Sequence, residues 1–164
     1  LRRRGRLRLI GTLDTGEGRA TLRLLRQLNH PAERVWHALT DPGELRAWFP
    51  SDENVTADEV EPHRLLAGTW YGEPLRFELV SADATSVLTM AHVVRDLGAA
   101  ARTAAGWECG FDALEALLAG TPLNDFTSLR RWSEFHETYS ALWGLDPEPG
   151  RQSFAAHPLT EDYR

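Results

Sequence analysis

The side chains able to do chemistry are few in this sequence of 164 residues, and their types exclude several mechanisms. The chain holds six histidines and one cysteine, and its 18 basic residues are all arginine. Without lysine there is no Schiff base, no phosphate-loop lysine and no Ser-x-x-Lys nucleophile pair, because arginine stays protonated and cannot replace an amine. Any catalysis would therefore rest on histidine, tyrosine and carboxylates, with arginine orienting or neutralising anions.

Motifs for metals, nucleotides and a nucleophilic serine are incomplete in this sequence. His136 and Glu137 begin a His-Glu-x-x-His zinc motif, but Ser140 stands where the second histidine is needed. The stretch 16–18 lacks the third glycine of a dinucleotide fingerprint, and Gly-x-Ser-x-Gly is absent. Cys109 has no histidine near it in the sequence, so we expect an inert thiol. We predict no catalytic residue, no metal site and no cofactor.

His92 is the histidine whose position indicates a role in a binding site. It shares one face of a strand with Leu88 and Met90, at a period of two. Its imidazole could act as a general base or donate a hydrogen bond to a ligand carbonyl. The alternative is a buried histidine whose hydrogen bonds are satisfied within the protein. Glu73 and Glu78 could be partners across the same sheet, although the sequence does not fix their geometry.

The elements that position these residues follow changes of period along the chain. Residues 6–13 and 20–28 flank a turn with two glycines and predict a hairpin. Two short helices should follow, at 31–39 and from Pro42 to Phe49, the second with Asp41 as its N-cap. Residues 55–94 alternate with a period of two and predict a meander of antiparallel strands, with turns at 61–63, 72–74 and 81–84.

A long helix is predicted from residue 99 and carries an apolar stripe made of Trp107, Phe111, Leu114 and Leu118. Gly120 and Pro122 end it. An amphipathic helix is predicted at about 127–143, and its side with Trp132, Phe135 and Tyr139 would cover the sheet edge or meet a second subunit, as in a homodimer. We predict one α+β domain over 1–144 and a proline-containing, loosely docked tail with little periodicity over 145–164.

Charge and composition narrow the class of partner. The net charge of −6 argues against a nucleic-acid-binding domain, although residues 1–26 carry +6 and residues 27–164 carry −12. The basic arm at 2–8 could contact an anionic surface or remain solvated. A single cysteine excludes an intrachain disulfide and favours the cytoplasm. No run reaches the roughly 18 apolar residues of a membrane span.

Two motifs carry a resemblance to a known family. The first runs from His30 to Pro42 and continues with Leu45 and Trp48-Phe49, and the second joins Ala105-Gly106-Trp107 to Phe111 and Gly120. In this order they look like the opening and the closing helix of the family named after the activator of the ninety-kilodalton heat-shock chaperone ATPase. The resemblance spans about residues 20–120. It implies membership of the START-like (SRPBCC) superfamily and a helix-grip fold, in which a curved antiparallel sheet wraps the long C-terminal helix around an apolar cavity.

One segment departs from that family. A glycine-rich strand pair usually follows the Trp-Phe motif, whereas here only residues 50–54 separate Phe49 from Val55. Five residues reach about 17 Å at most. Either the sheet is two strands short, which would open one wall of the cavity, or a segment is absent from this sequence.

The resemblance also implies which residues line the cavity: Trp70, Phe77, Met90 and His92 from strands, and Trp107 and Phe111 from the helix. The alternative is that these large side chains fill the space as core. We predict a protein that binds a hydrophobic, aromatic or lipid-like small molecule there, without catalysis. Two alternatives stay open: a cyclase, dehydratase or hydrolase on the same fold, and a co-chaperone. Against the co-chaperone, the chain has no room for the separate N-terminal domain of the eukaryotic activators.

Overall fold

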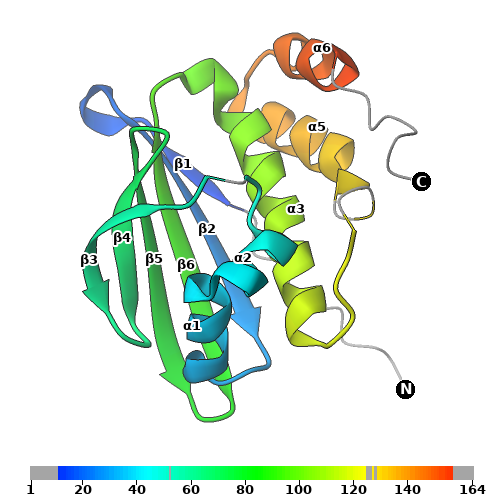
Figure 1. Cartoon of the computed structure of the whole chain (residues 1–164). Coiled ribbons are helices and arrows are strands. Elements are labelled where there is room, and N and C mark those ends of the chain that lie inside the picture. Colours follow the sequence, from blue (N-terminus) through cyan, green and yellow to red (C-terminus); the bar gives the residue numbers. More distant parts are fainter. Residues whose placement is uncertain (1–10, 52, 125–126, 128, 157–164) are drawn as a thin grey trace, which may run out of the picture.

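The computed structural model describes residues 11–51, 53–124, 127 and 129–156 (Figure 1). Within these residues, six strands form one antiparallel sheet in the order β1-β2-β6-β5-β4-β3. The strands are β1 (Thr12–Asp14), β2 (Ala20–Leu28), β3 (Thr56–Glu61), β4 (Leu65–Trp70), β5 (Glu73–Ala82) and β6 (Thr85–Val94). The helices are α1 (Ala32–Thr40), α2 (Pro42–Trp48), α3 (Ala100–Leu118), α5 (Trp132–Trp143) and α6 (Glu148–Ala156), with single 3-10 turns at Gly16–Gly18 and Leu97–Ala99.

The sheet curves around α3, and α5 and α6 lie on the side of α3 away from the sheet (Figure 1). The α+β helix-grip fold expected from the sequence is therefore confirmed. The core lies between the sheet and the long helix, where the concave-face residues of β2, β5 and β6 meet the apolar stripe of α3. The predicted stripe residues Trp107, Phe111, Leu114 and Leu118 are all buried there.

The two short helices meet at Asp41, which ends one and caps the other. The Asp41 N–H donates to the His37 carbonyl, and the Asp41 carboxylate accepts from the Glu44 N–H at 2.9 Å. Pro42 takes the first helical position, where its missing N–H is not needed. The Arg34 guanidinium donates to the Glu44 carboxylate at 2.7 Å and ties α1 to α2. The predicted cap is confirmed.

The connection from α2 to the sheet is short, as the sequence indicates. Four strands, β3 to β6, lie between α2 and α3 in the described chain, and β3 forms an exposed edge of the sheet. In the described residues the sheet therefore lacks the strand pair that the resemblance implies after the Trp-Phe motif. The wall between α2 and β3 is open, as described below.

The C-terminal region differs from the prediction in two places. The helix α5 begins at Trp132 rather than at 127, because the Asn124 side chain accepts from the Thr127 N–H at 2.8 Å and starts a separate turn before it. Residues 148–156 of the predicted loosely docked tail form a regular helix, α6. The Asp146 carboxylate accepts from the Glu148 N–H at 3.0 Å in a turn just before this helix. The prolines of the helix lie at or before its first turn, where no N–H is required.

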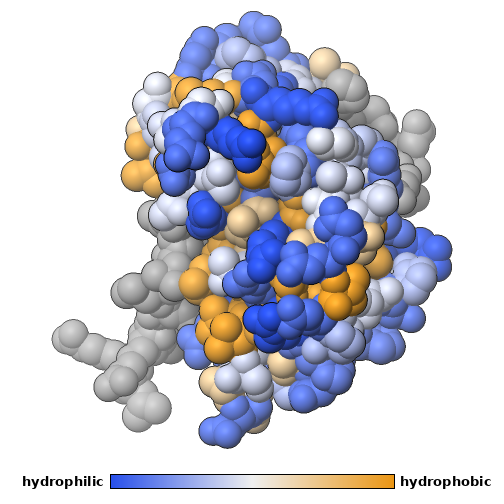
Figure 2. Space-filling view, turned by 90° about the vertical axis from the view of Figure 1, so that its left-hand side faces the viewer, coloured by the Kyte–Doolittle hydropathy of each residue, from blue (hydrophilic) through white to orange (hydrophobic). Residues whose placement is uncertain are grey.

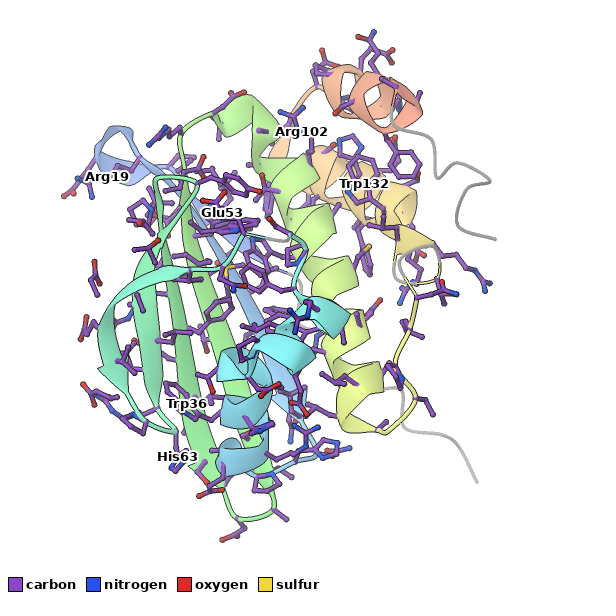
Figure 3. All side chains as sticks on the ribbon, viewed as in Figure 1. Arg19, Trp36, Glu53, His63, Arg102 and Trp132 are labelled. Atoms are coloured by element: carbon purple, nitrogen blue, oxygen red, sulfur yellow. The ribbon has the colours of Figure 1, made fainter. Side chains whose placement is uncertain are left out.

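The aromatic side of α5 is buried within this chain. Trp132 lies between α5 and α6 (Figure 3), stacked on His136 and on Phe154 with 4.7 Å between ring centroids in both pairs. Phe135 and Tyr139 are also buried, and α5 packs along α3. The Gly11 N–H, just before the edge strand β1, donates to the Tyr139 hydroxyl at 2.9 Å, so Tyr139 contacts this edge of the sheet, while Trp132 packs against α6. The basic arm at 2–8 lies outside the described residues.

The outer face of the sheet is mixed, because it carries ion pairs beside the exposed side chains of Leu25 and Val80. Arg76 pairs with Glu78 across 2.6 Å, and Arg64 pairs with Glu61. Figure 2 shows hydrophilic side chains separating the apolar patches on this side of the molecule. In the described part of the chain, no helix combines the length and apolar character needed to cross a bilayer.

Candidate functional site

An aromatic cluster fills the centre of the space between the sheet and α3. Trp107, on α3, is only 1% exposed. Its ring centroid lies 5.4 Å from that of Phe49, 5.1 Å from that of Trp70 and 5.7 Å from that of Phe77. Edge-to-face and tilted contacts of this kind stabilise a packed core. The cavity that the resemblance implies is therefore partly occupied by the protein's own rings.

Among the clefts of the described residues, two lie on either side of Phe49. The larger, which we call the Glu73 cleft, has a volume of about 300 Å³ and is lined by Pro50, Trp70, Tyr71, Glu73, His92, Thr103, Gly106 and Trp107. The smaller, which we call the apolar cleft, has a volume of about 240 Å³ and is lined by Leu39, Thr40, Pro42, Leu45, Trp48, Phe49, Asn54, Val55, Leu66 and Phe77. The apolar cleft opens at the short connection between α2 and β3.

Phe49 separates the two clefts. Its side chain lines the apolar cleft, and its ring packs on Trp70 and Trp107, which line the other. Phe49 follows the last residue of α2, where its N–H still donates to the Leu45 carbonyl. The end of a short helix thus places one ring between two cavities.

A tight hairpin positions Glu73. Trp70 pairs with Glu73 across a two-residue turn, in which Tyr71 and Gly72 both have positive φ. Because side chains alternate along a strand, Glu73 shares the concave face of β5 with Leu75, and Leu75 lies opposite His92. Glu73 and His92 therefore meet diagonally at the end of the β5–β6 ladder. The indole Nε1–H of Trp70 donates to the backbone carbonyl of Glu53, which is labelled in Figure 3. This bond holds the 49–55 connection against the cleft.

His92 lies between Trp107 and Glu73. Its Nδ1 accepts from the Trp107 Nε1–H at 3.1 Å, and its Nε2 lies 2.7 Å from Glu73 Oε2. Since Nδ1 accepts, the neutral ring carries its hydrogen on Nε2. Burial lowers the pKa of His92 and outweighs the opposing effect of the Glu73 carboxylate. Nε2 has no well-aligned hydrogen bond despite the short contact, so the N–H and the carboxylate are a close but imperfect pair.

The six residues predicted to line the cavity fall into three groups. Trp70, His92 and Trp107 come together in the Glu73 cleft, while Phe77 lines the apolar cleft. Met90 and Phe111 line neither and are fully buried in the core. Their role as ligand contacts stays a prediction.

The sequence analysis did not identify Glu73 as a cleft residue. It placed the turn at 72–74, whereas β5 begins at Glu73 itself. The Tyr-Gly pair before it, a two-residue turn between alternating segments, is the sequence feature that could have fixed the register. Phe49 was noted only as part of a motif, because nothing local shows which cavity its ring enters.

Other charged groups serve the scaffold. Arg26 on β2 donates to Glu108, Asp112 and Glu115 of α3 at 2.7, 3.2 and 3.1 Å. The Tyr139 hydroxyl of α5 donates to Glu108, so one buried network joins sheet, α3 and α5. Cys109 is buried, as expected for an unreactive thiol. In the part of the chain that the structure describes, no group of three or more histidine, cysteine or acidic side chains is placed to hold a metal ion.

The sequence matches no family model and no curated protein. Several solved structures share its fold. CalU16 from Micromonospora echinospora is 20% identical, with a TM-score of 0.62 over 80% of this chain and 94% of that one. A conserved protein of unknown function from Enterococcus faecalis is 16% identical, with a TM-score of 0.62 over 80% and 91%. DynU16, a putative protein in the dynemicin biosynthetic locus, is 21% identical, with a TM-score of 0.52 over 62% and 48%. At these identities the likeness shows the fold alone.

Proposed function

We propose that this chain is a cytoplasmic protein of the START-like superfamily that binds a hydrophobic or aromatic small molecule in the Glu73 cleft. The observation that carries the proposal is the cleft itself, bounded by Trp70, His92 and Trp107 between the sheet and α3. Its volume of about 300 Å³ is at the lower end of small-molecule sites. The biosynthetic locus of DynU16 supports a small molecule as the ligand class. The presence of a single cysteine, which cannot form an intrachain disulfide, supports the location.

Gly106 offers a direct test of the cleft. It lies on α3 and lines the cleft, and a Cβ built on it meets no atom within 4 Å. In Gly106→Leu the new side chain would occupy the cleft, while loss of a mid-helix glycine would favour the helix. We expect the affinity for N-phenylnaphthylamine, whose emission rises in apolar sites, to fall at least about tenfold, or about 1.4 kcal/mol. Gly106→Ala is the matched control, and its affinity for the same probe should fall by less than about threefold. Unchanged binding in Gly106→Leu would remove the cleft from the proposal.

Native mass spectrometry of the protein purified from its own host complements this test. It reports the mass of any bound molecule and the number of subunits in one measurement. A retained species of a few hundred daltons that Gly106→Leu loses would support the proposal and identify the ligand. The same spectra would decide between a monomer and the homodimer that the sequence analysis left open.

A small-molecule enzyme on the same fold is the second candidate, and the contact between Glu73 and His92 favours it. Both ring nitrogens of His92 face protein groups, so its part in an acid–base step would be to orient and polarise Glu73. His92→Ala should then abolish turnover of the identified ligand without unfolding the chain. Retained turnover would remove His92 from the mechanism.

Membership of the chaperone-activator family rests on the two motifs alone. The first motif forms α1 and α2, and the second runs from Ala105 within α3 to Gly120 just beyond its end, in the order that the resemblance implies. Stimulation of the ATPase of the cognate chaperone by this chain would support the co-chaperone function. No stimulation at saturating protein would overturn it.

A further inference from the structure

We infer that the Glu73 cleft selects ligands that carry a protonated amine on an aromatic body, with the Glu73 carboxylate as the anchor. This rests on the proposed function and adds the chemical class of the ligand. Four observations support it: among the described residues the carboxylate has no arginine partner, burial disfavours a charge on its histidine neighbour, the walls are aromatic, and α3 leaves room beside it.

Arginine partners distinguish Glu73 from other partly buried carboxylates in this chain. Glu44 pairs with Arg34 at 2.7 Å, and the three acidic residues of α3 share Arg26. Glu73 has a side chain only 25% exposed, yet in the described residues its one ion-pair contact is with His92. The guanidinium of Arg95, beside the same hairpin, donates to the Gly72 carbonyl at 2.9 Å instead.

His92 does not neutralise the carboxylate. Its Nδ1 is occupied by the Trp107 N–H, and burial lowers its pKa, so the ring is neutral at neutral pH. The charged group that faces the His92 ring is Glu73, and the aromatic rings in contact with His92 are those of Trp70 and Trp107. A ligand that covers Glu73 must replace the water around an uncompensated negative charge. A cationic group does this at the lowest cost, because it forms a charge-assisted hydrogen bond as it removes the water.

The walls around the carboxylate favour the same ligand. Trp70 packs beside Tyr71, with ring centroids 5.2 Å apart, and both line the cleft with Trp107. Indole and phenol faces attract cations through their quadrupoles, and their area also buries a flat apolar body. On the facing helix, Gly106 leaves open space where any other residue would carry a Cβ. An aromatic body can therefore lie along α3 while its amine reaches Glu73.

Three probes with one naphthalene body test this selectivity: naphthylmethylamine, naphthylmethanol and naphthoate. At a pH of about 7.5 the first is a cation, the second is neutral and the third is an anion. We expect the amine to bind at least about tenfold more tightly than the alcohol, and the naphthoate most weakly. Raising the salt concentration should weaken the binding of the amine and leave the affinity for the alcohol unchanged, because of these two probes only the amine binds through an ionic interaction. Equal affinities would overturn the inference and leave the proposed function standing.

Variants of two glutamates on β5 locate the selectivity. Glu73→Gln keeps the shape of the side chain and should abolish the preference for the amine, while the affinity for the alcohol changes by less than about twofold. Glu73→Asp keeps the charge and should retain part of the preference. Glu78→Gln is the matched control, because Glu78 lies on the same strand outside the cleft and pairs with Arg76. A preference that persists in folded Glu73→Gln would overturn the inference. If neither the three probes nor N-phenylnaphthylamine binds the wild type, the proposed function itself fails.

Discussion

The two clefts beside Phe49 have similar volumes but different chemistry. Trp48 lies in the wall of the apolar cleft and Trp107 in the wall of the Glu73 cleft, and the indole of each donates a hydrogen bond. In the apolar cleft the Trp48 N–H donates to the Ala38 carbonyl at 2.8 Å, which satisfies a backbone group at the end of α1. In the Glu73 cleft the Trp107 N–H donates to a histidine that in turn contacts a carboxylate. The polar residues lining the apolar cleft, Thr40 and Asn54, are uncharged.

The difference shows that volume does not identify a binding site. About 300 and about 240 Å³ are comparable sizes, and both clefts have aromatic walls. What separates them is a polar group that the protein itself does not fully satisfy, since such a group gives a ligand both orientation and specificity. The apolar cleft follows from the short α2–β3 connection, whereas the Glu73 cleft is built by a hairpin, a strand and a helix together.

Removing the partition between the clefts should have the largest effect. Phe49→Ala takes a ring away from Trp48, Trp70 and Trp107, and we expect the free energy of unfolding to fall by about 3–5 kcal/mol. Urea denaturation followed by circular dichroism measures this loss. Val60→Ala, at an exposed position of β3, is the control and should cost less than about 0.5 kcal/mol. A loss below about 1 kcal/mol for Phe49→Ala would mean that the ring is not a packed partition.

Matched substitutions of the two indoles should separate stability from binding. Trp48→Phe and Trp107→Phe each leave one buried acceptor unpaired, so both should lose about 1–3 kcal/mol of unfolding free energy. Only Trp107→Phe removes the hydrogen bond that holds the ring of His92. We therefore expect only this variant to lower the affinity for naphthylmethylamine, by about fivefold or more. Isothermal titration calorimetry provides the affinities. Equal weakening by both variants would show that the clefts are coupled rather than distinct.

The pH dependence of stability tests the buried histidine of the Glu73 cleft. Burial lowers the pKa of His92 below its ordinary value of 6.5, so below that pH the unfolded chain binds more protons than the folded one. The contribution of His92 to the free energy of unfolding is therefore fully present above pH 6.5. It is lost as the pH drops toward the folded pKa, by at most about 1.4 kcal/mol per pH unit. His136, whose pKa burial also lowers, acts in the same direction.

His92→Gln should reduce the difference in unfolding free energy between pH about 7.5 and pH about 5.5 by up to about 1 kcal/mol. Urea titrations at the two pH values measure it. Trp48→Phe is a suitable control, because it lowers stability without removing a histidine and should keep the full difference. A pH dependence identical to that of the wild type in His92→Gln would contradict the buried, neutral state of the ring.

The smallest effect is expected at the rim of the Glu73 cleft. The Tyr71 hydroxyl and the Ser51 hydroxyl are 2.7 Å apart in an exposed hydrogen bond. Tyr71→Phe removes this bond and keeps the ring, so it should cost less than about 0.5 kcal/mol of stability and change naphthylmethylamine affinity by less than about twofold. Thermal denaturation measures the change in stability, and calorimetry measures the change in affinity. A larger loss of affinity would make the Tyr71 hydroxyl a ligand contact and extend the polar part of the cleft.

Most of the fold was predictable because its elements are set by local patterns. The Asp41–Pro42 cap, the alternation along β6 and the stripe on α3 each depend on residues within a few positions of one another. The helix α6 was not predicted, because the prolines and weak periodicity of this segment favoured a loosely docked tail. What stabilises it is the stacking of Phe154 on Trp132, a contact between separate helices.

The sequence alone determined that His92 shares one face of a strand with Leu88 and Met90 and that Trp107 lies on the apolar stripe of a long helix, and the resemblance implied that these two faces meet. Only the tertiary structure decided that Trp107 donates to one nitrogen of His92 and that Glu73 meets the other. The physical reason is that these three residues lie on β5, β6 and α3, and their meeting depends on strand register and helix packing rather than on local periodicity. The same packing placed Phe49 between the clefts, and so left one cavity with an anchor for charge and the other without.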